Sequence, residues 1–109
     1  MPLVNIVMTS RPGELLHMDT VGPSRVCSVG GKWYVLVVVD DVSRYTWVYF
    51  LESKDEAFGC FLELTLRLEK ELPSSPLRAI RSDNGTEFRN AHFKTFCSGQ
   101  GVEHQFSSP

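Results

Sequence analysis

The sequence predicts a single α/β domain with a mixed five-stranded sheet, in the order β-β-β-α-β-α-β. Three strand-like segments come first, a long segment with helical apolar periodicity follows, and shorter strand-like and helix-like segments then alternate. A chain of 109 residues with 42% hydrophobic residues is long enough for one domain with a core. Residues 1–12 show no clear period and are expected to form a tail, so the domain is expected to span 13–109.

The first three strands are expected to form a meander. Residues 15–20 form the first strand, which Gly22 and Pro23 end. Residues 33–39 are apolar throughout, which predicts a strand that is buried on both faces in the middle of the sheet. Residues 45–51 form the third strand, and the short polar link before it predicts an antiparallel pair.

A strong helix signal follows the third strand. The sequence from Ser53 to Glu56 matches a capping box, in which the Ser53 side chain accepts from the Glu56 amide and Glu56 reaches back. Apolar residues then recur at helical spacing until Pro73 ends the pattern. These residues are Ala57, Phe61, Leu64, Leu68 and Leu72. A right-handed crossover through this helix is expected to return a parallel strand to the sheet.

Three shorter elements complete the expected domain. Residues 77–82 form a fourth strand, and Asp83-Asn84-Gly85 forms a tight loop. A helix over 87–98 is expected to place Phe88, His92 and Phe96 on one face and to end at Gly99 and Gly101. Residues 102–106 form the fifth strand.

Two aspartates lie where ligand sites gather in α/β sheets. Asp19 is on the first strand, where an apolar residue would pack better, and Asp83 is at the carboxyl end of the fourth strand. If these strands are neighbours, about 4.8 Å apart, a hard cation such as Mg²⁺ would relieve the repulsion between the two carboxylates. A turn role for both aspartates remains open and, from spacing alone, is the commoner interpretation.

The composition bears on several other classes of protein. No apolar segment is long enough to span a bilayer and no signal peptide is evident, so an intracellular protein without a membrane partner is expected. Cys27, Cys60 and Cys97 are widely spaced and form no CxxC pair, which disfavours a zinc site or a disulfide framework and predicts buried, reduced thiols. The net charge of −2 is not typical of a dedicated nucleic-acid binder.

Four motifs resemble those of copia-type retrotransposon integrases. They are LHMDTVGP at 16–23, VDDVSRYTWVYFL at 39–51, RSDNGTEF at 81–88 and GVEHQFSSP at 101–109. Together they extend over residues 12–109 in the order of that family, so the combined signal is far more specific than any one motif.

The resemblance implies an RNase H-like fold with a site for metal-dependent DNA strand transfer. It implies two aspartates and one glutamate that bind Mg²⁺ or Mn²⁺, and Asp19 and Asp83 match the two aspartates. The glutamate is expected beyond Pro109, so the catalytic core is expected to be truncated at its C-terminus and inactive as this fragment. DNA partners (retrotransposon ends and target DNA), a homo-oligomer, and a location in the nucleus or a cytoplasmic particle are also implied.

Two other functions remain open alongside this one. The first is a non-catalytic transposon remnant that binds nucleic acid or protein, and the second is a nuclease of the RNase H type, which the motif at 81–88 fits less well. Among the nearby polar residues, Glu87 is interpreted as a favourable acid at a helix start. Asp40 and Asp41 are interpreted as turn residues, and His17 as a satisfied, partly buried side chain.

Overall fold

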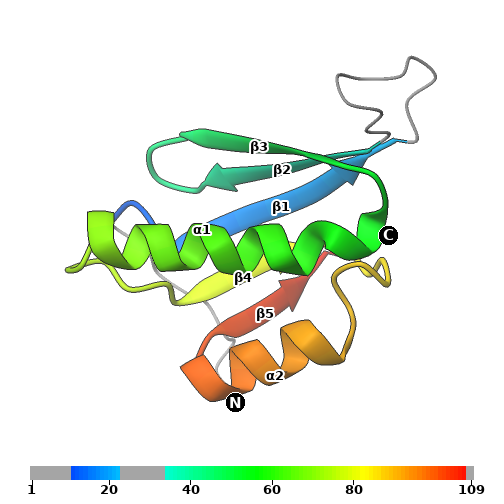
Figure 1. Ribbon diagram of the computed structural model, residues 1–109. Helices are drawn as coiled ribbons and strands as arrows, with labels where there is room; N and C mark the ends of the chain where they lie inside the picture. The colour runs from blue at the N-terminus through cyan, green and yellow to red at the C-terminus, as the bar shows by residue number, and fades with distance from the viewer. Residues whose placement is uncertain (1–10, 23–33, 108–109) are drawn as a thin grey trace.

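The computed structural model describes residues 11–22 and 34–107, which form a five-stranded sheet with two helices on one face (Figure 1). The strands are β1 (Leu15–Val21), β2 (Tyr34–Asp40), β3 (Thr46–Leu51), β4 (Ala79–Ser82) and β5 (Glu103–Phe106). The helices are α1 (Ala57–Glu71), which follows a 3₁₀ turn at Lys54–Glu56, and α2 (Ala91–Gln100). The expected order of elements is confirmed. Cys27, Trp33 and most of the expected tail lie outside the described residues.

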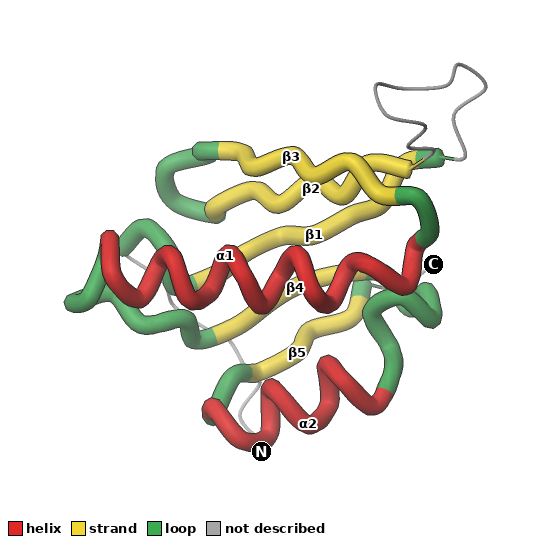
Figure 2. Tube along the Cα trace, viewed as in Figure 1, coloured by secondary structure: helices red, strands yellow, loops and turns green. Residues whose placement is uncertain are grey.

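The strands lie in the order β3-β2-β1-β4-β5. β1 pairs antiparallel with β2, and β2 pairs antiparallel with β3, so the meander is confirmed. β4 lies parallel to β1 and β5 lies parallel to β4, because α1 and α2 carry the chain back across the sheet between them (Figure 2). The first and fourth strands are therefore neighbours, as the candidate site requires.

Alternate residues of β1 lie on opposite faces of the sheet. Leu16 and Met18 are buried in the core under the helices, whereas His17 and Asp19 lie on the open face. β2 alternates in the same way: Leu36 is completely buried, but the next residue is only half-buried. The prediction that this strand is buried on both faces is wrong for the described chain, because both helices pack on the same face.

α1 covers the centre of the sheet with the apolar stripe that its sequence predicts, extended by Thr65. The predicted capping box is wrong, because Ser53 and Glu56 make other side-chain hydrogen bonds than the predicted pair. The Ser53 hydroxyl donates to Asp55, and the Glu56 carboxylate accepts from the backbone N–H of Glu52 at 3.2 Å. The Glu56 N–H donates to the Ser53 carbonyl at 3.2 Å, so the first turn is a 3₁₀ turn.

α2 begins later than its sequence pattern predicts. Asn90 is the N-cap, and its side-chain oxygen accepts from the Phe93 N–H at 3.1 Å. Phe93 and Cys97 form the buried face, whereas His92 is exposed. The predicted face is wrong because Phe88, although completely buried, lies in the turn before the helix and does not share its periodicity.

An aromatic cluster joins both helices to the sheet. Phe93 of α2 lies 5.2 Å from Phe61 of α1 and 5.9 Å from Phe88, measured between ring centroids. Trp47 and Tyr49 of β3 pack against the same core, as their strand positions predict. Neither helix of the described chain has the length and apolar composition needed to cross a membrane.

Candidate active site

Asp19 and Asp83 lie at the same end of two adjacent parallel strands. Leu16 of β1 pairs with Ile80 of β4. Asp19 in β1 and Asp83 directly after β4 therefore both lie just beyond the C-terminal end of the paired region. Both aspartates are exposed, and both line a shallow pocket of about 290 Å³. The other residues that line it are His17, Met18, Arg81, Ser82 and Ser107. The structure thus brings the two predicted site residues into one pocket.

The loop after β4 orients Asp83 through its own hydrogen bonds. One carboxylate oxygen, Oδ1, accepts from the Gly85 N–H at 2.8 Å, and the Ser82 hydroxyl donates to the Asp83 carbonyl at 2.9 Å. An aspartate that binds the amide two residues ahead forms an Asx turn. The turn interpretation and the site interpretation are therefore compatible, because the turn presents the carboxylate at the mouth of the pocket.

Ser82 also connects this loop to β5. Its hydroxyl oxygen also lies 2.8 Å from the His104 Nε2, within hydrogen-bond distance. Burial lowers the pKa of His104 from 6.5 to about 4, since the charged ring loses hydration. His104 is therefore neutral near pH 7, and its hydrogen bond with Ser82 supports the strand end that precedes Asp83.

Glu87 lies in the turn between β4 and α2 and is not the first residue of a helix, which corrects the prediction. Its side chain is only 6% exposed, and its Oε2 lies 3.8 Å from the Lys54 Nζ. The same oxygen accepts from the Thr20 hydroxyl at 2.7 Å. Thr20 directly follows Asp19 in the motif at 16–23, but no pattern in the sequence indicates its bond to Glu87.

The other acids near the sheet have structural partners. Asp40 is completely buried and accepts from the Gly13 N–H at 2.5 Å and from the N–H and hydroxyl of Ser43, each at 2.7 Å. Its predicted turn role is confirmed. The His17 Nε2 lies 2.8 Å from the Asp41 Oδ1, and the histidine is half-buried as predicted.

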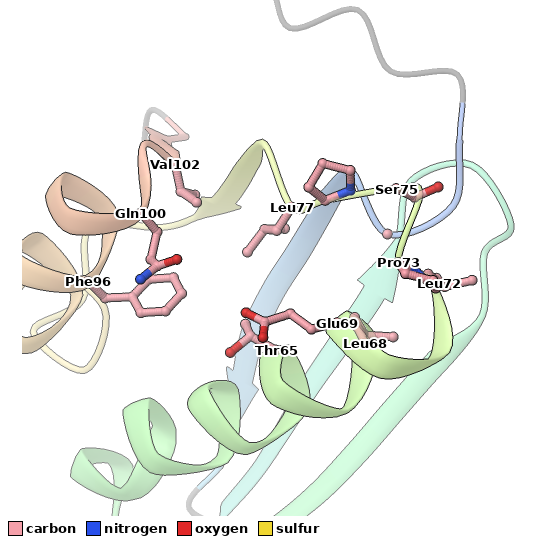
Figure 3. A pocket seen from close by; sticks show the side chains of 12 residues that line it. Thr65, Leu68, Glu69, Leu72, Pro73, Ser75, Leu77, Phe96, Gln100 and Val102 are labelled. Atoms are coloured by element: carbon pink, nitrogen blue, oxygen red, sulfur yellow. The ribbon is translucent and has the colours of Figure 1, made fainter.

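A second pocket, of about 200 Å³, lies between the C-terminal ends of α1 and α2 (Figure 3). Leu68 and Phe96 are among its apolar lining residues, and Glu69 and Gln100 are among its polar ones. None of the predicted site residues lines it. It therefore belongs to the packing of the two helices and not to the pair of aspartates.

The two aspartates form a donor set that suits a hard divalent cation. Mg²⁺ binds oxygen ligands, commonly one or two carboxylates with several waters, and both carboxylates here are open to water. Among residues 11–22 and 34–107, no group of three or more His, Cys, Asp or Glu side chains is arranged to hold a metal ion. Cys97 is a buried thiol, and its burial raises its pKa.

The fold and the paired aspartates define an α/β domain of the RNase H-like class. The sequence profile of the integrase core domain family matches residues 9–109, and this chain belongs to that family. The resemblance to retrotransposon integrases that the motifs indicate is thereby confirmed.

Known relatives agree with this assignment. The chain is 36% identical over 96 residues to the retrovirus-related Pol polyprotein from transposon TNT 1-94 of Nicotiana tabacum, with 88% of this chain covered. It is 31% identical over 109 residues to that from transposon RE2 of Arabidopsis thaliana, with 99% covered. It spans only 7% of the length of each polyprotein.

A solved structure agrees with the fold. The catalytic core domain of HTLV-2 integrase, in complex with magnesium and in a trimeric form, matches with a TM-score of 0.69 and 21% sequence identity. The match covers 88% of this chain and 60% of that one. The prediction of an RNase H-like integrase core fold is confirmed.

Proposed function

We propose that this chain contributes the first two carboxylates of a metal-dependent DNA strand-transfer site, with residues 13–109 as the catalytic core and 1–12 ahead of it. Asp19 and Asp83 are the proposed ligands of Mg²⁺ or Mn²⁺. The observation that carries the proposal is that both line one pocket, at the same end of neighbouring parallel strands. Membership of the integrase core family supports it, as does the magnesium in the HTLV-2 integrase structure.

The chemistry of the site depends on the placement of the two carboxylates. A divalent ion, when bound, would supply positive charge for activating a nucleophile and stabilising a leaving oxygen in phosphoryl transfer. The chain itself contributes orientation. The Asx turn holds Asp83, and pairing with β2 and β4 fixes the strand that bears Asp19. Both carboxylates face solvent, so the pocket is open to a phosphate backbone.

The proposed partners follow from the same assignment. The substrates would be the ends of a retrotransposon and its target DNA, handled in the nucleus or a cytoplasmic particle. The HTLV-2 integrase core is described as trimeric, which supports a homo-oligomer for this chain.

The proposal is tested by titrating Mn²⁺ into the 109-residue chain by calorimetry. Two carboxylates without a third make a weak site, so we expect a millimolar Kd. Either substitution alone, Asp19→Asn or Asp83→Asn, is expected to abolish binding. Glu63→Gln is the control, because it removes one exposed carboxylate on α1, away from the pocket. An unchanged Kd in Asp83→Asn would show that the ion binds elsewhere and would contradict the proposal.

The same samples serve for a strand-transfer assay on labelled duplex DNA with Mn²⁺. We expect no activity from the 109 residues alone, because losing one charge-stabilising group commonly costs two to three orders of magnitude, roughly 10²–10³-fold, in rate. A longer polypeptide that supplies a third carboxylate to the site is expected to join DNA ends, and Asp83→Asn in it is not. An inactive extended polypeptide would favour the non-catalytic remnant instead.

A further inference from the structure

Glu87 carries a buried carboxylate. It lies in the turn that follows β4 and is hydrogen-bonded to β1, the strand that bears Asp19. Burying a charge is costly unless it is paired and hydrogen-bonded. The side chain of Glu87 is 6% exposed, and its close partner is the Thr20 hydroxyl, at 2.7 Å from Oε2. Lys54 is farther away, at 3.8 Å, and is itself 45% exposed, so it contributes little. The hydrogen bond to Thr20 is therefore the specific contact of this carboxylate.

This hydrogen bond reaches β1 directly behind Asp19. Successive residues of a strand point to opposite faces, so Thr20 points away from the open face on which Asp19 lies. Thr20 and Glu87 are 67 residues apart in the chain. The bond therefore ties the end of β1 to the loop that follows β4, beyond the last backbone pair between these strands, His17 with Arg81.

Gly85 gives Glu87 its second point of contact. A Cβ at Gly85 would lie 2.5 Å from the Glu87 Oε1 and 3.0 Å from the Asp83 Oδ1. The φ of Gly85 lies outside the left-handed region, so its backbone conformation does not require glycine. Space is the reason instead: the carboxylates of Asp83 and Glu87 both sit against the Gly85 Cα. Glu87 thus braces the turn that presents Asp83.

We infer that Glu87 is a positioning residue, which sets the Asp83 turn relative to the Asp19 strand through its contact with Gly85 and its hydrogen bond to Thr20. The inference rests on the proposed function, in which Asp19 and Asp83 share a divalent ion. Mg²⁺ demands nearly ideal octahedral geometry, whereas Ca²⁺ tolerates irregular and larger sites. Loosening this brace therefore weakens Mg²⁺ binding more than Ca²⁺ binding, and it frees the turn even when no ion is bound.

The first test compares hydrogen exchange at the Gly85 N–H, which donates to the Asp83 Oδ1, in the metal-free chain. Thr20→Val keeps the shape of threonine and removes the hydroxyl, so we expect faster exchange at Gly85 than the change in global stability explains. Thr20→Ser restores the hydroxyl and is expected to restore slow exchange. Thr65→Val is the matched control, because it removes the hydroxyl of a buried threonine that donates to the Leu62 carbonyl on α1, away from Thr20. Unchanged exchange in Thr20→Val would overturn the inference.

The second test measures Mg²⁺ and Ca²⁺ binding by calorimetry in the same variants and in Glu87→Gln. Removing a group that orients a metal ligand typically costs about 10–100-fold in affinity. We expect Thr20→Val to raise the Mg²⁺ Kd about tenfold, with a smaller rise for Ca²⁺, and Thr20→Ser to stay near the unsubstituted chain. An equal rise for both ions would mean a purely structural role and would overturn the inference.

The two tests separate the inference from the proposed function. If Asp83→Asn leaves the metal affinity unchanged, the proposed function fails. The exchange rate at Gly85 still decides whether Glu87 braces the turn. Glu87→Gln retains an acceptor oxygen for Thr20, so exchange at the Gly85 N–H is expected to stay slow in this variant. If exchange at Gly85 is faster in Glu87→Gln than in Thr20→Val, the hydrogen bond between Thr20 and residue 87 is not what protects the turn.

Discussion

His104 shows how one side chain can make the stability of this domain depend on pH. It lies on β5, is hydrogen-bonded to the Ser82 hydroxyl and stacks on Phe106, with the ring centroids 3.9 Å apart. Burial lowers its pKa to about 4, whereas the ring in an unfolded chain takes up a proton near pH 6.5. Between these two values the unfolded state binds more protons, so the free energy of unfolding falls as the pH falls through this window.

We expect His104→Gln to remove most of this dependence while keeping a side-chain donor for Ser82. The loss of stability in the unsubstituted chain between pH 7 and pH 5 should be at most about 1–2 kcal/mol, because one pKa unit corresponds to about 1.4 kcal/mol and the ring remains partly exposed. Denaturant unfolding at both pH values measures it. His92→Gln, an exposed position on α2, is the control and should retain the dependence. Equal losses in the unsubstituted chain and His104→Gln would show that other groups are responsible.

At the scale of the elements, α2 has one glycine inside the helix and another at its end. Gly99 lies within the helix, and a Cβ there would meet nothing within 4 Å. Gly101 is the C-cap in the left-handed conformation, with φ +66°, and the Val102 N–H donates to the Cys97 carbonyl at 2.9 Å to close the helix. The two glycines therefore have opposite effects on stability, although they are only two residues apart.

Gly99→Ala is expected to stabilise the domain by about 0.5–1 kcal/mol, because alanine loses less backbone entropy in a helix. Gly101→Ala is expected to destabilise it by about 1–2 kcal/mol, because the left-handed conformation brings Cβ too close to the following carbonyl oxygen. Thermal or denaturant unfolding of the two variants distinguishes these effects. Substitutions that change stability in the same direction would contradict the assigned end of α2.

At the scale of the whole molecule, the face of the sheet opposite the helices bears a row of exposed apolar side chains. Val48 is 50% exposed, Phe50 is 56% exposed and Val21 is 57% exposed, on β3 and β1. A contiguous apolar surface of this kind favours association, and lysine on an edge strand opposes it. The open face of the described chain therefore carries an apolar row on β3 and β1 as well as the polar residues of the candidate site.

We expect the chain to self-associate as its concentration rises and Val48→Lys to reduce this association. The substitution should change the free energy of unfolding by no more than about 0.5 kcal/mol, because the side chain faces solvent. Sedimentation velocity at several concentrations measures the association. Thr46→Lys adds the same charge to the same exposed face of β3 without removing an apolar group, so it should have the smaller effect. If Val48→Lys leaves the association unchanged, a surface other than this apolar row is responsible for it.

The sequence predicts the strands and their order well because those features depend on local apolar patterns and on the handedness of crossovers. It predicts that Asp19 and Asp83 meet if the first and fourth strands are neighbours, and the structure places β1 beside β4. It misplaces the start of α2, since Glu87 and Asn90 both suit a helix start and only the tertiary structure selects Asn90. It also misses the bond between Thr20 and Glu87, which depends on packing between distant segments and leaves no periodic signal.

The parallel pairing of β1 with β4 also determines when, during synthesis of the chain, Asp19 and Asp83 can come together. β2 and β3 are joined by a short turn and pair locally. The second edge of β1 can pair with β4 only after α1 and β4 have been synthesised. A ribosome adds roughly 5–20 residues per second, so Asp83 is synthesised several seconds after Asp19. Closing so long a loop is entropically costly, and contacts of this kind slow folding. The emerging chain therefore passes through a period in which Asp19 has been synthesised and Asp83, its counterpart, has not.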